Sequence, residues 1–114
     1  MKQNLEYAKK VVAIAIDALE DIKAIDIQII DTSKLTPLFS NMIVCSGNSS
    51  TQVAALARNL VDKLKENEIK LVGIEGEREG QWILVDTGEV VIHIMLPAVR
   101  SYYDLEDLWE NEEE

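Results

Sequence analysis

Carboxylates at short spacing are the groups in this sequence best suited to catalysis. Two-metal phosphoryl transfer uses two or three such acids to clamp divalent ions, commonly as an acid-x-acid pair on a strand. Asp26 has Gln28 at the second position of such a pair, and an amide cannot supply the required charge. Glutamates alternate over residues 75–79, but they stand in a glycine-bounded stretch with Arg78 among them, which indicates a solvated acidic loop. The acids therefore form no complete catalytic set.

A lone cysteine and a lone histidine are the other reactive side chains. Cys45 lies in an apolar run with no basic neighbour to lower its pKa, so we expect a buried, inert thiol. His93 has no second His or Cys at metal-ligand spacing, so we expect a partly buried sheet histidine beside Trp82, with a metal or general-base role as the alternative. Residues 46–50, SGNSS, resemble an anion-binding turn but lack the Gly-Lys-Ser/Thr ending of a phosphate loop, and helix capping explains them. We expect no catalytic residue, no metal and no cofactor.

Composition and charge limit the kinds of partner and the kinds of fold that this sequence can have. The chain has 114 residues, 47% of them hydrophobic, and a formal net charge of −10. This length and composition predict one folded domain with a single core. The negative charge disfavours direct DNA or RNA binding, because that binding needs clustered Lys and Arg, and it favours a basic partner. No apolar run approaches the ~20 residues of a membrane span, and the first residues do not resemble a signal peptide, so we expect a cytoplasmic protein without membrane contact.

Apolar periodicity predicts the elements of the first half. Apolar residues spaced by three and four over residues 5–22 indicate an amphipathic helix, and alternation over residues 25–29 indicates a strand. An ordered loop over residues 31–41 follows, and then a second strand over residues 42–45. Ser49 and Gln52 have the spacing of a capping box, which predicts a second helix reaching about Asn67.

The second half reads as strands followed by a short helix. The predicted strands are residues 71–74, 81–86 and 89–96. The strands at 81–86 and 89–96 form a hairpin about Thr87 and Gly88. The strand at 71–74 is expected to run parallel to the strand at 42–45. Pro97 ends the last strand, and the spacing of Leu105, Leu108 and Trp109 marks a final helix. The prediction is one α/β (α+β) domain over residues 1–109, a mixed five-stranded sheet flanked by helices in the order α-β-β-α-β-β-β-α. Residues 110–114 should be a frayed acidic tail.

The hairpin has two different faces. A two-residue loop would place Trp82 opposite His93 and Leu84 opposite Val91, on one face. The other face is wholly aliphatic and should be the core covered by helices; it carries Ile83, Val85, Val90, Ile92 and Ile94. The first, which we call the docking face, mixes apolar and acidic groups around an aromatic anchor: Trp82, Leu84, Asp86, Glu89, Val91, His93 and Met95. The alternative is a second packed layer closed by the C-terminal helix.

Residues 76–95, GEREGQWILVDTGEVVIHIM, closely resemble the ribosomal silencing factor (RsfS, Iojap-related) family. The shared pattern is Glu-Gly-x-x-x-Gly-x-Trp-x-Leu-x-Asp-x-Gly-acid, continuing into an apolar strand with a His. Similar segments extend the likeness over about residues 5–109. The resemblance implies a fold similar to nucleotidyltransferases but without their catalytic motif, in agreement with Gln28 at the position of a second acid. We also expect Tyr102, Tyr103 and Glu106, which lie in a C-terminal segment similar to that of the family, to bind the partner together with the docking face.

The resemblance implies a translation repressor that is not an enzyme. Members of this family bind ribosomal protein fourteen of the large ribosomal subunit, block subunit joining and repress translation when nutrients are scarce. They are also described as self-associating, so a homodimer is expected when the protein is free. Two alternatives remain open. One is a nucleotidyltransferase-like enzyme that uses the turn at residues 46–50 with acids from Asp26, Asp31 or Asp86. The other is a general assembly factor of the large subunit.

Overall fold

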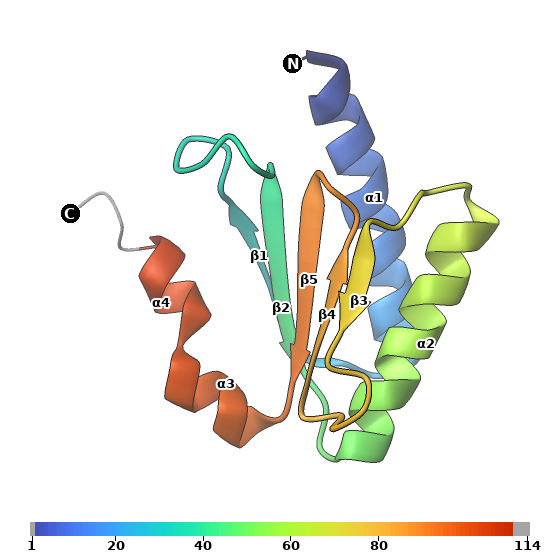
Figure 1. Ribbon diagram of the computed structural model, residues 1–114, viewed down its shortest axis with the longest axis vertical. Helices are drawn as coiled ribbons and strands as arrows, with labels where there is room; N and C mark the ends of the chain where they lie inside the picture. The colour runs from blue at the N-terminus through green and yellow to red at the C-terminus, as the bar shows by residue number, and fades with distance from the viewer. Residues whose placement is uncertain (1, 111–114) are drawn as a thin grey trace.

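A computed structural model describes residues 2–110, with side chains from residue 5 to residue 107 (Figure 1). Over these residues the chain forms a central five-stranded sheet with α1 and α2 on one face and α3 and α4 on the other. This arrangement confirms the predicted mixed sheet flanked by helices. The elements in chain order are α1 (Lys2–Asp21), β1 (Ile25–Asp31), β2 (Asn41–Ser46), α2 (Ser50–Glu66), β3 (Gly73–Glu75), β4 (Trp82–Asp86), β5 (Val90–Met95), α3 (Pro97–Tyr103) and α4 (Leu105–Glu110).

The sheet has the order β1-β2-β5-β4-β3. β2 and β5 are parallel neighbours, whereas β1 with β2, β4 with β5, and β3 with β4 are antiparallel pairs. β2 and β3 therefore run in the same direction, as the strand-helix-strand pattern predicts. They are not neighbours, because the β4–β5 hairpin returns between them and takes the place beside β2.

The main core lies between the sheet and the first two helices. Val11, Leu19, Leu56 and Leu60 are fully buried there against the aliphatic face of the hairpin. Every residue assigned to that face from the sequence is at most 1% exposed, which confirms the assignment. A smaller cluster lies under α3 and α4 on the opposite face; its buried members are Ile30, Met42, Val44 and Met95.

The register of the β4–β5 hairpin differs from the prediction. Trp82 lies opposite Met95 and Leu84 opposite His93, so the two-residue loop was wrong and residues 87–90 lie between the last paired positions. The Thr87 hydroxyl explains the longer connection. It accepts the Val90 amide N–H at 3.1 Å and donates to the Val90 carbonyl at 2.8 Å. Because the register shifts by two, each side chain keeps its predicted face.

The C-terminal segment forms two helices in place of the single predicted one. Pro97 occupies the first turn of α3, consistent with its fixed φ and missing N–H. Asp104 follows α3 with φ of 51°, a left-handed conformation that ends the helix and turns the chain into α4. The side chains of Leu108 and Trp109 lie outside the described part of the chain. The tail expected to fray covers residues 110–114; its first residue, Glu110, is the last residue of α4, and residues 111–114 lie outside the described part.

Candidate docking face

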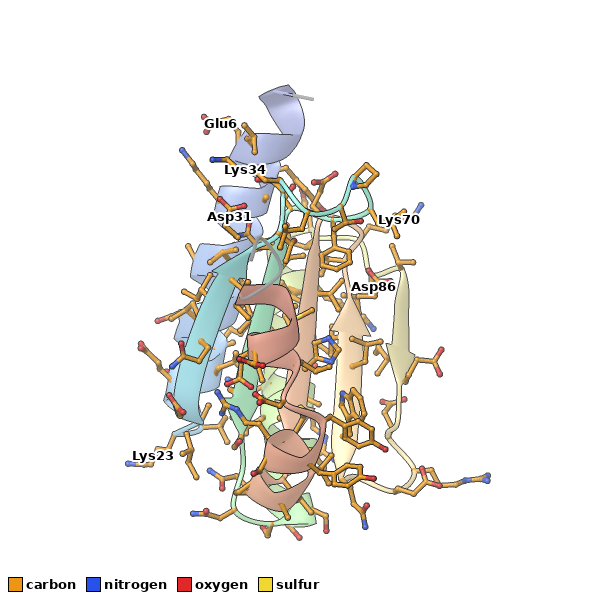
Figure 2. The ribbon with its side chains drawn as sticks, turned by 90° about the vertical axis from the view of Figure 1, so that its left-hand side faces the viewer. Glu6, Lys23, Asp31, Lys34, Lys70 and Asp86 are labelled. Carbon is orange, nitrogen blue, oxygen red and sulfur yellow. The ribbon has the colours of Figure 1, made fainter. Side chains whose placement is uncertain are left out.

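The C-terminal helices cover only part of the docking face. Viewed from that side, α3 and α4 cross in front of β2 and β5, and β4 and β3 remain uncovered beside them (Figure 2). Met95 on β5 is 0% exposed, whereas Trp82 and Leu84 on β4 are half-buried. The face is therefore a packed layer at its centre and an open surface along β4.

Three aromatic side chains meet where β4 passes α3. Tyr102 is 81% exposed and Tyr103 is 53% exposed, although both are large and partly apolar. The ring centroids of Tyr103 and Trp82 are 4.8 Å apart, and those of Tyr102 and Tyr103 are 5.0 Å apart in an edge-on arrangement. We call Trp82, Tyr102 and Tyr103 the aromatic patch. Exposed clusters of Tyr and Trp are typical of protein interfaces, because they offer large contact areas at low entropic cost.

His93 lies beneath this patch. The Trp82 indole N–H donates to Nδ1 of His93 at 3.0 Å, and the two rings are 5.9 Å apart and tilted. His93 is buried, and burial lowers its pKa to about 4. The expected place of His93 in the sheet beside Trp82 is confirmed, but the side chain is buried and not partly buried as expected.

Acidic side chains border the uncovered strand. Asp86 lies at the end of β4, at the upper end of that strand in Figure 2 and away from α3, and its carboxylate accepts the Gly88 amide N–H at 2.8 Å. Glu75 was expected in a solvated loop with its neighbours, but it lies in β3 directly opposite Leu84. Opposed residues share a face, so the exposed Glu75 side chain belongs to the docking face. The sequence could have indicated this position of Glu75. Ile74 packs against the main core, and side chains alternate along a strand, so the next residue, Glu75, lies on the opposite face of the sheet.

The other predicted contact residues have internal partners or are partly covered. Glu89 is half-buried and accepts a hydrogen bond from the Ser40 hydroxyl at 2.7 Å, which ties the hairpin end to the loop before β2. Val91 is half-buried between Met42 and Asp86 in the sheet. Met95 is fully buried and offers no surface. Of the ten predicted residues, Trp82, Leu84, Tyr102 and Tyr103 come together as one open surface.

Arg100 was missed as a structural residue by the sequence reasoning. It is 8% exposed, and Nε and one terminal nitrogen donate to Glu106 at 3.1 and 2.8 Å. The remaining N–H groups donate to Ser46 Oγ and to the carbonyls of Ile25 and Asp26. Arg100 thus fastens α3 and α4 to β1 and β2, and it uses the carboxylate of Glu106 internally. No local pattern could reveal this, because the partners lie up to 75 residues away.

The cysteine, the serine turn and the acid-amide pair that were considered for catalysis are buried or hydrogen-bonded within the fold. Cys45 is buried, and burial raises the pKa of its thiol to about 12. Ser49 caps α2 by accepting the Gln52 amide N–H at 3.1 Å, as the capping box predicts. The Gln28 amide donates to the Asp26 carboxylate at 2.8 Å on the exposed edge strand. Within residues 2–110, no three His, Cys, Asp or Glu side chains gather as a metal site would require, and no helix is long and apolar enough to cross a membrane.

Comparison with known proteins identifies the group to which this architecture belongs. The sequence pattern of the family described as "Ribosomal silencing factor during starvation" matches residues 5–114. The chain belongs to the ribosomal silencing factor family. Ribosomal silencing factor RsfS of Chromobacterium violaceum is 59% identical over 96 residues, which are 84% of this chain and 79% of that protein. The resemblance inferred from the sequence is confirmed.

Structural comparison agrees with membership of the silencing factor family. A crystal structure of a Chromobacterium violaceum protein, 56% identical, matches with a TM-score of 0.88 and covers 90% of this chain and 85% of that one. A more distant relative is the mouse protein named "Mitochondrial assembly of ribosomal large subunit protein 1", 32% identical over 90% of this chain and 46% of that protein. The silencing factors are ribosome-associated regulatory proteins, so translation regulation, expected from the sequence, is the role of this family.

Proposed function

We propose that this protein binds ribosomal protein fourteen of the large ribosomal subunit through the docking face, and that it sterically blocks joining of the small subunit. It would act as a cytoplasmic translation repressor under nutrient limitation. The observation that carries the proposal is the aromatic patch, with Tyr102 at 81% and Tyr103 at 53% exposure beside Trp82. Burial of an open aromatic surface of this kind against a partner contributes favourably to the free energy of binding.

The charge of the chain supports a ribosomal partner. The formal net charge is −10, and Glu75 and Asp86 border the uncovered strand β4. Ribosomal proteins that contact RNA are basic, and opposite charges speed encounter and orient the docking partners. The acids at the rim would therefore meet a basic surface, while the aromatic patch would supply the apolar contact.

Co-sedimentation with separated subunits tests the proposal. The protein should travel with large subunits alone, and adding it before the small subunits should reduce the fraction of joined ribosomes. Equal binding to small subunits, or unchanged joining at saturating protein, would contradict the proposal. Sedimentation of the free protein would show in the same series whether it self-associates, as we expect.

Assembly of the large subunit is the second candidate function. The name of the mouse relative supports it, since that protein is named for assembly of the mitochondrial large subunit. An assembly factor would use the same docking face. Deletion of the gene would then cause immature large particles to accumulate, whereas a repressor of joining would leave mature large subunits and raise translation during starvation.

We infer further that the protein is not a nucleotidyltransferase. Gln28 stands where a second metal-binding acid would be needed, and its amide is hydrogen-bonded to Asp26. Incubation with magnesium and labelled nucleoside triphosphates should transfer no label to any acceptor. Incorporation that Asp26→Ala abolishes would restore the enzyme as the leading function.

A further inference from the structure

His93 is a polar residue in an apolar setting. In the sheet it lies between Leu84 of β4 and Val44 of β2, and it is 9% exposed. A leucine would fill such a place without the cost of removing an imidazole from water. Burial lowers the pKa of His93 to about 4, so the ring is neutral at physiological pH. The hydrogen bond that the structure shows for this ring is the contact with Trp82.

The geometry of that contact fixes the indole. An indole N–H can only donate, so Nδ1 of the neutral His93 ring is the acceptor, at 3.0 Å, and the ring proton lies on Nε2. The indole has a single polar atom, and the hydrogen bond restricts the side-chain torsions that would turn it. Tyr103 contacts the same indole from α3, with ring centroids 4.8 Å apart. The indole is thus held from β5 on one side and from α3 on another.

We propose that His93 is a positioning residue, which holds the Trp82 indole in the orientation that the partner of the docking face contacts. This inference rests on the proposed function, because it requires Trp82 to contact the large subunit. A side chain that is already fixed loses less conformational entropy on binding. His93 is 9% exposed and offers the partner little surface of its own, so removal of the acceptor should weaken binding mainly through the indole.

A double-mutant cycle with His93→Leu and Trp82→Phe tests the coupling. Leucine removes the acceptor, and phenylalanine removes the indole N–H while an aromatic ring remains. Titration of purified large subunits should show that His93→Leu weakens binding about 2- to 10-fold in the wild-type background, on the scale of ordering one side chain. The same change in Trp82→Phe should have no effect. Equal losses in both backgrounds would overturn the proposal, since His93 would then act independently of the indole.

The free protein supplies a readout that does not depend on ribosomes. The Trp82 indole N–H gives one of two indole resonances in a ¹⁵N spectrum, and it is assigned by its loss in Trp82→Phe. His93→Leu should shift this resonance and accelerate its exchange with water. His93→Asn, whose amide oxygen can approach the position of Nδ1, should restore slow exchange and part of the affinity. An unchanged resonance in His93→Leu would overturn the proposal.

These outcomes separate this inference from the proposed function. If wild-type protein fails to bind large subunits, the proposed function fails, and the positioning role in binding fails with it, whatever the indole exchange. If wild-type protein binds but His93→Leu loosens the indole without loss of affinity, the positioning role alone is wrong. Should His93→Leu fail to fold, His93→Val, a smaller apolar side chain that also lacks an acceptor, takes its place in the cycle with Trp82→Phe, and additive losses in that pair would equally overturn the coupling.

Discussion

The indole of Trp82 and the imidazole of His93 are hydrogen-bonded at 3.0 Å although they are not cross-strand partners. Trp82 lies opposite Met95, and His93 lies opposite Leu84, so the bond runs diagonally across the hairpin. Diagonal neighbours on one sheet face are within reach of long aromatic side chains. The contact joins the buried centre of the docking face to its open edge. Trp82 therefore packs against the smaller cluster on one side and is exposed to solvent on the other.

Replacement of Trp82 by alanine should reduce binding more than folding. The open aromatic patch would lose its largest side chain, and we expect a loss of about 2 kcal/mol or more in binding free energy, the scale of an interface hot spot. Titration of large subunits measures this loss. Urea unfolding of the same variant should show a smaller cost, since the Trp82 side chain is half-buried and belongs to the smaller cluster.

Ile83→Ala is the matched control for that variant. One residue along β4, Ile83 is 1% exposed and packs in the main core, so its truncation should lower the free energy of unfolding by about 2–5 kcal/mol. The folded fraction should still bind large subunits normally. If Trp82→Ala unfolds the protein as strongly as Ile83→Ala and its folded fraction binds as wild type does, Trp82 is a core residue only.

Mild acid should destabilise the protein through His93. Burial lowers its pKa from 6.5 to about 4, so between these pH values the unfolded chain binds a proton that the folded chain does not. The free energy of unfolding should therefore be flat above about pH 6.5 and fall by roughly 2 kcal/mol by pH 5. Urea unfolding at pH 7.5 and pH 5 measures the change.

His93→Leu removes this part of the pH dependence and serves as its control. Asp31 contributes in a different range, because hydrogen bonds from Ser33 lower the pKa of its carboxyl below the ordinary 3.8. Its stabilisation is present above that value and is lost only in stronger acid. A wild-type and a His93→Leu protein with equal slopes between pH 7.5 and pH 5 would show that His93 titrates normally in the folded state.

The faces of the hairpin could be predicted from the sequence, whereas its register could not. Alternation assigns each side chain to a face, and a shift by two residues leaves that assignment unchanged. The register depends on the hydroxyl of Thr87, which bonds both backbone groups of Val90 and lengthens the turn. The residue types Thr-Gly favour a two-residue turn. The hydrogen bonds of the Thr87 hydroxyl to Val90, which favour the longer turn, can be seen only in the structure.

Contacts between segments far apart in the chain also could not be predicted from the sequence patterns. Residue periodicity predicts each element but not which strands become neighbours, so the insertion of the hairpin between β2 and β3 was not foreseen. The meeting of Trp82 with Tyr103 depends on how α3 returns over the sheet. That return depends on Arg100, whose carbonyl partners Ile25 and Asp26 lie at the start of β1.

Loss of the Arg100 side chain should destabilise the fold. Arg100→Met would leave the half-buried Glu106 carboxylate and two carbonyls of β1 without their donors. We expect the free energy of unfolding to fall by about 3 kcal/mol, the scale for removing one partner of a buried charged pair. Arg78→Met is the control, since Arg78 is exposed in the loop before β4 and its change should stay within about 0.5 kcal/mol. Equal effects of the two changes would mean that Arg100 does not fasten the C-terminal helices.

The affinity for large subunits should fall as salt concentration rises. Exposed charges are screened over about 8 Å at physiological ionic strength, and Glu75 and Asp86 border the open strand β4. Glu75→Gln should weaken binding at low salt by about 2- to 5-fold and reduce the salt dependence, because a rim charge contributes at most about 1 kcal/mol. Glu20→Gln is the matched control, since Glu20 is exposed on α1, across the sheet from the docking face. An affinity that stays flat from low to high salt would show that the aromatic patch binds without help from the acids. A loss from Glu20→Gln as large as that from Glu75→Gln would instead place the basic partner on the α1 side of the molecule.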